Sequence, residues 1–177
     1  MRATSTSIAL VILLSVSDAW AAPMMPRAVR HQIDEAKAAC GGSLLPLARD
    51  AVVAEDLTGD GIVEWIVNET KFHCKNGPAS MFEGSHGGLQ AVFLGLPNGE
   101  AKIAFELITY GRRLERTRAG VRLWLPVAGA LCGPAEPIEA ATRKLCERPL
   151  VWNSKTGVLD FDDLSSTRPL ADTLPGY

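Results

Sequence analysis

The sequence lacks the short signatures that would point to a common enzyme class. It contains no phosphate-binding glycine loop, no dinucleotide fingerprint and no His-Glu-x-x-His zinc motif. It has no large excess of one charge, because 18 Lys and Arg face 20 Asp and Glu, and this near balance argues against a nucleic-acid binder. No segment repeats at a fixed period, which argues against a solenoid or a propeller. These absences exclude several classes of protein but assign no activity.

The first twenty-odd residues have the pattern of an export signal. Arg2 gives a short positive start, Ile8 to Val16 form an apolar core, and Ala19-Trp20-Ala21 places small residues at a cleavage site. The apolar run is far shorter than the ~20 residues that span a bilayer. We therefore predict cleavage before Ala22, export to the periplasm or the extracellular space, and no membrane span in the mature chain.

The remaining chain is the size of one folded domain. Its composition is 47% apolar and 21% charged, which is typical of a globular protein. The segment 164–177 carries two prolines and many small polar residues, and we expect it to be a loosely held tail. The predicted organisation is a signal peptide at 1–21, a single globular domain at 22–163 and this tail at 164–177.

All four cysteines lie in the predicted mature part. An even number of cysteines in an exported chain indicates two disulfides, for which three pairings exist. We favour Cys40–Cys74 and Cys132–Cys146, because each bond then joins neighbouring segments. No Cys-x-x-Cys or His-x-x-x-His pair is present, so a zinc cluster is not indicated.

Hydrophobic periodicity predicts one helix followed by about eight short strands. Between Pro26 and Cys40, apolar residues recur every three or four positions, and Gly41-Gly42 follows as a stop signal. After Asp50 the pattern changes to alternation with β-branched residues, which is typical of strands. We expect strands at 51–56, 62–68, 89–95, 101–108, 112–117, 121–127, 150–153 and 158–161, and a short helix at 138–145. The predicted fold is α+β: an N-terminal helix packed on an antiparallel meander sheet of roughly eight strands, stapled by disulfides.

The segment 56–64 has the oxygen pattern of a calcium loop. Side-chain oxygens occur at loop positions one, three, five and nine, position six is glycine, and position seven offers a carbonyl. The candidate ligands are the side chains of Asp56, Thr58, Asp60 and Glu64 and the backbone of Ile62. With three carboxylates and a threonine, we expect millimolar-grade affinity. The alternative is a tight hairpin whose aspartates accept hydrogen bonds from turn amides.

The sequence Asp-Leu-Thr-Gly-Asp-Gly-Ile-Val-Glu-Trp-Ile-Val resembles the calcium-type loop of FG-GAP/VCBS repeats. In those proteins the loop joins two strands and often binds calcium. Thr58 and Glu64 depart from the usual Asn or Asp and Asp, although both keep an oxygen. The loop occurs once, so the resemblance does not imply a complete propeller.

The chain as a whole also resembles small exported bacterial proteins of uncharacterised function. The matching features are an N-terminal helix ending in cysteine, one Asp-Gly hairpin, a glycine-rich loop, a later Cys-Gly segment and a tryptophan near the end. In this sequence they correspond to Cys40, the 56–64 loop, Glu83 to Gly88, Cys132-Gly133 and Trp152, with Cys74 between them. The resemblance implies a compartment and a fold more than an activity.

We therefore expect a non-enzymatic exported domain with a structural or binding role and a calcium-stabilised loop. One alternative is a hydrolase that uses Glu64 with Asp60 on an envelope polymer. Another is an anion-binding module that uses the arginines of one predicted hairpin, with a solvated strand face as the plainer interpretation. Those arginines are Arg112, Arg113, Arg116, Arg118 and Arg122.

Overall fold

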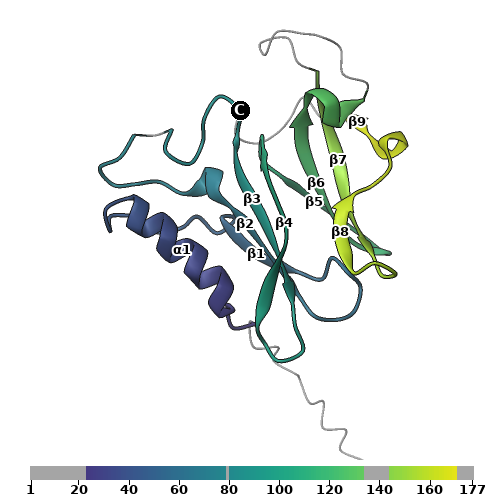
Figure 1. Cartoon of the computed structure of the whole chain (residues 1–177), viewed down its shortest axis with the longest axis horizontal. Helices are drawn as coiled ribbons and strands as arrows, with labels where there is room; N and C mark the ends of the chain where they lie inside the picture. Colours follow the sequence, from purple (N-terminus) through teal and green to yellow (C-terminus); the bar gives the residue numbers. More distant parts are fainter. Residues whose placement is uncertain (1–22, 79, 134–143, 171–177) are drawn as a thin grey trace, which may run out of the picture.

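The computed structural model describes residues 23–78, 80–133 and 144–170, and the predicted signal peptide and residues 171–177 lie outside them. The described chain forms three layers (Figure 1). Helix α1 covers one face of a first sheet, and a second sheet covers the opposite face. The α+β class is therefore confirmed.

Helix α1 (Arg27–Ala39) is the predicted N-terminal helix. Pro26 precedes it, and its last turn closes when the Gly42 amide donates to the carbonyl of Lys37 at 2.8 Å. Gly41 and Gly42 have φ values of 60° and 82°, a left-handed conformation that glycine adopts without a Cβ clash. Val29, Gln32 and Ala36 form the buried face.

The described strands form two antiparallel sheets. The first has the order β1 (Val52–Glu55), β2 (Glu64–Asn68), β3 (Gly88–Gly95) and β4 (Ala101–Thr109). The second has the order β5 (Arg113–Thr117), β6 (Gly120–Ala128), β7 (Leu145–Asn153) and β8 (Val158–Phe161), and β9 (Arg168–Pro169) pairs with β7. Short 3-10 turns are η1 (Glu69–Lys71), η2 (Gly129–Cys132) and η4 (Leu164–Ser166).

The prediction of a single meander sheet is wrong in one respect, since the strands divide between β4 and β5. After β4 the chain crosses to the second layer, where the Tyr110 amide donates to the carbonyl of Pro126 at 3.0 Å. The physical reason is that the first sheet is apolar on both faces. Trp65 and Val67 pack toward the helix, whereas Ile66 and Val92 pack into a second core with the other sheet. One continuous sheet with a helix on one side would leave the second face in water.

Strand β7 begins earlier than its predicted start at position 150. Leu145, the last residue of the predicted short helix, is the first residue of β7, so the helix is wrong there; positions 138–143 lie outside the described residues. Pro149 made the first half of β7 hard to recognise, because proline normally argues against an internal strand. In the structure Pro149 pairs opposite Trp124, and its carbonyl accepts from the Asp162 amide at 2.9 Å.

Both predicted disulfides, Cys40–Cys74 and Cys132–Cys146, are confirmed, with Cα–Cα distances of 5.2 and 5.7 Å. The first ties the end of α1 to the segment after η1. Backbone hydrogen bonds support it there, because the Lys75 amide donates to Ser43 and the Leu45 amide to His73. No helix in the described part of the chain is long and apolar enough to cross a membrane.

A β-bulge in β4 decides which side chains face the helix. Phe93 pairs with Ile103 and Val92 with Phe105, so Ala104 has no residue opposite it. Ala104 and Phe105 both pack toward the second sheet, whereas Ile103 stays on the helix side. Strict alternation along β4 therefore fails at this position.

Candidate functional site

The 56–64 loop is a tight turn between β1 and β2 whose carboxylates accept hydrogen bonds from loop amides. Asp56 accepts through Oδ1 from the Gly59 amide at 2.7 Å and through Oδ2 from the Gly61 amide at 3.0 Å. Asp60 Oδ1 accepts from the Ile62 amide at 2.8 Å. These bonds satisfy amides that the turn leaves without a backbone partner.

Glu64, the first residue of β2, binds the beginning of this loop from the protein interior. Its side chain is fully buried, and Oε2 accepts from the amides of Leu57 at 2.8 Å and Thr58 at 3.1 Å. Burial raises the pKa of Glu64 to about 7, although the two amide hydrogen bonds lower it and the charges of Asp60 and Asp56 raise it further. Glu64 Oε1 and Thr58 Oγ1 are buried without a hydrogen-bond partner.

The structure does not gather the loop carboxylates around one centre. Across residues 23–78, 80–133 and 144–170, no three His, Cys, Asp or Glu side chains lie in an arrangement that could hold a metal ion. Asp56, Asp60 and Glu64 are directed at backbone amides instead. This donor arrangement does not fit a calcium ion as it stands, and calcium binding at the loop stays a prediction.

Three of the five arginines in the β5–β6 region have partners within the protein. Arg112, directly before β5, donates to the carbonyl of Ile66 on β2 at 2.9 Å and to the carbonyl of Asp50. Burial lowers the pKa of Arg112 to about 10, while Asp50 and Glu55 raise it. Arg116 pairs with Glu55 across the layers. Arg118 lies in the turn between β5 and β6, and Arg122 is the third residue of β6.

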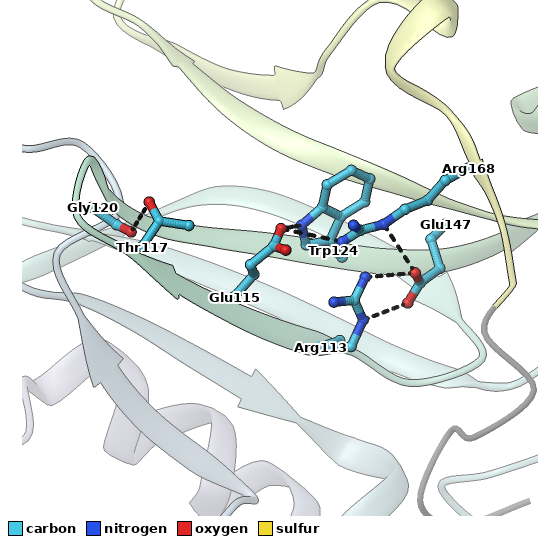
Figure 2. A network of polar contacts seen from close by, with 7 residues as sticks. All are labelled: Arg113, Glu115, Thr117, Gly120, Trp124, Glu147 and Arg168. Carbon is cyan, nitrogen blue, oxygen red and sulfur yellow. Dashed lines mark hydrogen bonds and ion pairs between the residues drawn. The ribbon is translucent and has the colours of Figure 1, made fainter.

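Arg113 belongs to a polar network on the second sheet (Figure 2). Glu147, fully buried on β7, accepts from Arg113 Nε at 3.0 Å and Arg113 Nη2 at 2.7 Å, and Arg168 Nε lies 3.3 Å from it. The Arg168 guanidinium lies 3.2 Å from the Trp124 ring centroid, and the indole N–H donates to Glu115 at 2.7 Å. The network holds β9 against the sheet.

Arg168 comes from the segment predicted to be a loosely held tail. Positions 164–170 of that segment lie within the described residues and carry η4 and β9. Pro169 pairs with Cys146 and Arg168 with Glu147 on β7. The first half of the segment therefore packs on the second sheet.

A concave site lies elsewhere, between α1 and the helix-facing side of β3 and β4. This α1–β4 groove encloses about 530 Å³. Its helix wall is made of small or polar residues, and its floor is mostly aromatic and aliphatic. The lining residues are Ala28, His31, Gln32, Glu35, Ala36, Ala39, Glu69, Phe82, Leu89, Phe93, Ile103 and Glu106.

The polar groups of the groove are rich in hydrogen-bond acceptors. Gln32 is 8% exposed, and its Nε2 donates to Glu69 Oε1 at 2.7 Å, which leaves Gln32 Oε1 buried without a partner. Burial raises the pKa of Glu69, the hydrogen bond from Gln32 lowers it, and the charges of Glu106 and Glu35 raise it. The carboxylates of Glu35, Glu69 and Glu106 therefore lie close enough for their charges to interact.

Sequence reasoning missed this groove, although its parts were recognised separately. The sequence predicts the helix before Cys40 and a strand at 101–108, but it does not predict how the two lie relative to each other. The groove exists because Ala28 and Ala39 are too short to fill the space beside the sheet, and because the bulge at Ala104 keeps Ile103 on that side. Local sequence patterns predict neither the position of these alanines beside the sheet nor the bulge at Ala104.

Comparisons of the chain with protein-family models, with curated proteins and with solved structures gave no match. The function is therefore argued from the geometry of the sites.

Proposed function

We propose that this protein is an exported, non-enzymatic binding domain whose ligand occupies the α1–β4 groove. Export is supported by two disulfides, which form and persist in oxidising compartments, and by the signal-like pattern at 1–21. The binding role is carried by one observation: a groove of about 530 Å³ with an apolar floor and a few convergent polar groups. Ligand sites commonly have this size and lining.

The exposed apolar side chains on the same face support this choice. Ile103 in the groove floor is 53% exposed, and Ile108 farther along β4 is 58% exposed. Neighbouring apolar groups exposed to water on one sheet face are typical of an interaction site. Met81, in the loop that precedes β3, adds a third exposed apolar side chain.

The competing proposals have less support. A hydrolase that uses Glu64 needs that carboxylate at a surface, whereas Glu64 is fully buried and bound to its own loop. An anion site on the hairpin needs free guanidinium groups, whereas Arg112 donates to backbone carbonyls, Arg113 pairs with Glu147 and Arg116 pairs with Glu55. We therefore prefer the groove.

The test is amide chemical-shift mapping of the oxidised protein with short, apolar-rich peptides. We expect perturbed signals from α1, β3 and β4 around the groove. Ile103→Lys should abolish the perturbation, because it places a charged side chain in the apolar floor. Val158→Lys, at a residue 48% exposed on β8, is the matched control and should leave binding unchanged. Perturbations confined to the second sheet would refute the assignment.

A second candidate role is calcium binding at the 56–64 loop. It is favoured by the two buried oxygens without partners, Glu64 Oε1 and Thr58 Oγ1, and by the resemblance to FG-GAP/VCBS loops. Asp56 and Asp60 would have to turn from the loop amides toward the ion. Bound calcium would supply positive charge beside buried Glu64, and its role would be structural.

The melting temperature of the oxidised protein tests this second role. If the loop binds calcium with sub-millimolar to millimolar affinity, a few millimolar calcium should stabilise the folded state by about 1–2 kcal/mol. That corresponds to a rise of a few degrees. A chelator should reverse the rise and Asp60→Ala should remove it, whereas Asp34→Ala, on exposed α1, should keep it. An unchanged melting temperature would leave the loop as a plain turn.

A further inference from the structure

We infer that the α1–β4 groove selects a basic, amphipathic peptide segment, in which Lys or Arg alternates with bulky apolar residues. The inference rests on the proposed binding function and names the chemistry of its ligand. It combines three features of one site: an apolar floor, an orphaned acceptor at Gln32 and carboxylates with no basic side chain other than His31 among the lining residues.

The orphaned acceptor belongs to Gln32, a residue that lines the groove, and it favours a ligand that brings a hydrogen-bond donor. Gln32 is more than nine-tenths buried, and its Nε2 is held by Glu69, so its Oε1 is fixed in place without a hydrogen bond. A buried acceptor without a hydrogen bond destabilises the folded protein, and a ligand N–H that bonded to this oxygen would remove that penalty. An acidic or acceptor-only ligand would leave this oxygen unsatisfied.

The charges around the groove require a cation. Glu35, Glu69 and Glu106 line it from the helix, the η1 turn and β4 respectively. His31 is the one other ionisable lining residue, and it lies 3.5 Å from Glu35 on the exposed helix surface. Three carboxylates against one histidine give the groove a negative potential that favours ammonium or guanidinium groups.

The floor requires apolar groups beside the cation. Phe93 and Leu89 from β3 and Ile103 from β4 form a surface that a simple polyamine would leave in water. A peptide with alternating lysine and leucine places apolar side chains on this floor and amines toward the carboxylates. Such a segment binds by burial of apolar surface, and charge pairing adds selectivity.

Three peptides of one length, in which leucine alternates with lysine, glutamine or glutamate, test the inference by calorimetry and shift mapping. The lysine peptide should bind most tightly, the glutamine peptide about three- to tenfold more weakly, and the glutamate peptide weakest. Glu106→Gln should weaken the lysine peptide about threefold and leave the glutamine peptide unchanged. Glu100→Gln, an exposed carboxylate at the β3–β4 turn that does not line the groove, is the matched control. Added salt should reduce the preference for lysine.

Each outcome separates the ligand class from the binding function. Equal affinity of all three peptides at the groove would overturn the inference and keep the proposed function. Preference for glutamate would do the same. If none of the three perturbs groove signals while other apolar-rich peptides do, the inference fails alone. If no peptide perturbs them, both fail.

Discussion

Among single residues, two glutamates are fully buried in the part of the chain that the structure describes, and their surroundings differ. Glu64 faces backbone amides, and its pKa is raised to about 7 by burial. Glu147 faces two guanidinium groups from Arg113 and Arg168. A buried carboxyl group is tolerated when it accepts hydrogen bonds or is paired with an opposite charge. Glu64 accepts hydrogen bonds from amides, and Glu147 is paired with positive charge.

Glu64 should make stability depend on pH in the absence of calcium. Its pKa is higher in the folded protein than in the unfolded chain, so its contribution is fully present below about pH 4.5 and is lost as pH rises through about 7. Each unit of pKa shift is about 1.4 kcal/mol, so a rise from 4.5 to about 7 sets the loss at no more than about 3–4 kcal/mol. Urea unfolding in the presence of a chelator should show that the free energy of unfolding of Glu64→Gln rises relative to that of the natural protein between about pH 5 and pH 8. A constant difference would contradict the buried, protonated state.

Two of the glutamates that pair with arginine, Glu147 and Glu55, allow a matched comparison. Glu147→Gln should lower the free energy of unfolding by about 2–4 kcal/mol, because it leaves two guanidinium groups beside a buried amide. Glu55→Gln removes the partner of Arg116, whose side chain is 62% exposed, and should cost less than about 1 kcal/mol. Chemical denaturation of both variants measures the difference. Similar losses would show that Glu147 is not the centre of the network.

At the scale of elements, the groove results from the short side chains of α1 and the bulge of β4. Ala28, Ala36 and Ala39 follow one another at helical spacing on the wall that faces the groove. The Cys40–Cys74 disulfide fixes the end of this helix. The helix therefore stands beside the β3–β4 half of the sheet without covering it completely.

Filling the groove from α1 should block the ligand and keep the fold. Ala39 is exposed and lines the groove, whereas Ala38 is exposed and does not line it. Ala39→Trp should weaken binding of the lysine peptide about tenfold, with a stability change below about 1 kcal/mol. Ala38→Trp should bind normally. Calorimetry and thermal melting separate the two effects, and equal binding by both variants would place the ligand elsewhere.

For the molecule as a whole, local sequence patterns predict the individual elements better than they predict how these elements lie relative to one another. The N-terminal helix, strands β1 to β6 and β8, the second half of β7 and both disulfides follow from periodicity, glycine signals and cysteine spacing, whereas the first half of β7 and strand β9 were not predicted. The division into two sheets does not, because it depends on Ile66 and Val92 facing a second core. The groove was also missed, since no local pattern places α1 relative to Ile103. The 56–64 turn was recognised, but its chemistry depends on the burial of Glu64.

The shared core predicts that the two sheets unfold together. Ile66→Ala, at a fully buried residue between them, should cost about 2–5 kcal/mol and shift the whole transition. Ile103→Ala, at a residue 53% exposed, should cost less than about 1 kcal/mol. Tryptophan fluorescence and circular dichroism should report one coincident transition. Two separated transitions would mean that the sheets are independent.

The most direct test of the account is the position of a bound peptide. Intermolecular nuclear Overhauser effects should be measured on the oxidised protein with the leucine–lysine peptide. We expect contacts from the leucine methyl groups to Ile103, Leu89 and Phe93, and from the lysine side chains to the neighbourhood of Gln32 and Glu106. Contacts to the second sheet or to the 56–64 loop, with none to Ile103, would contradict it.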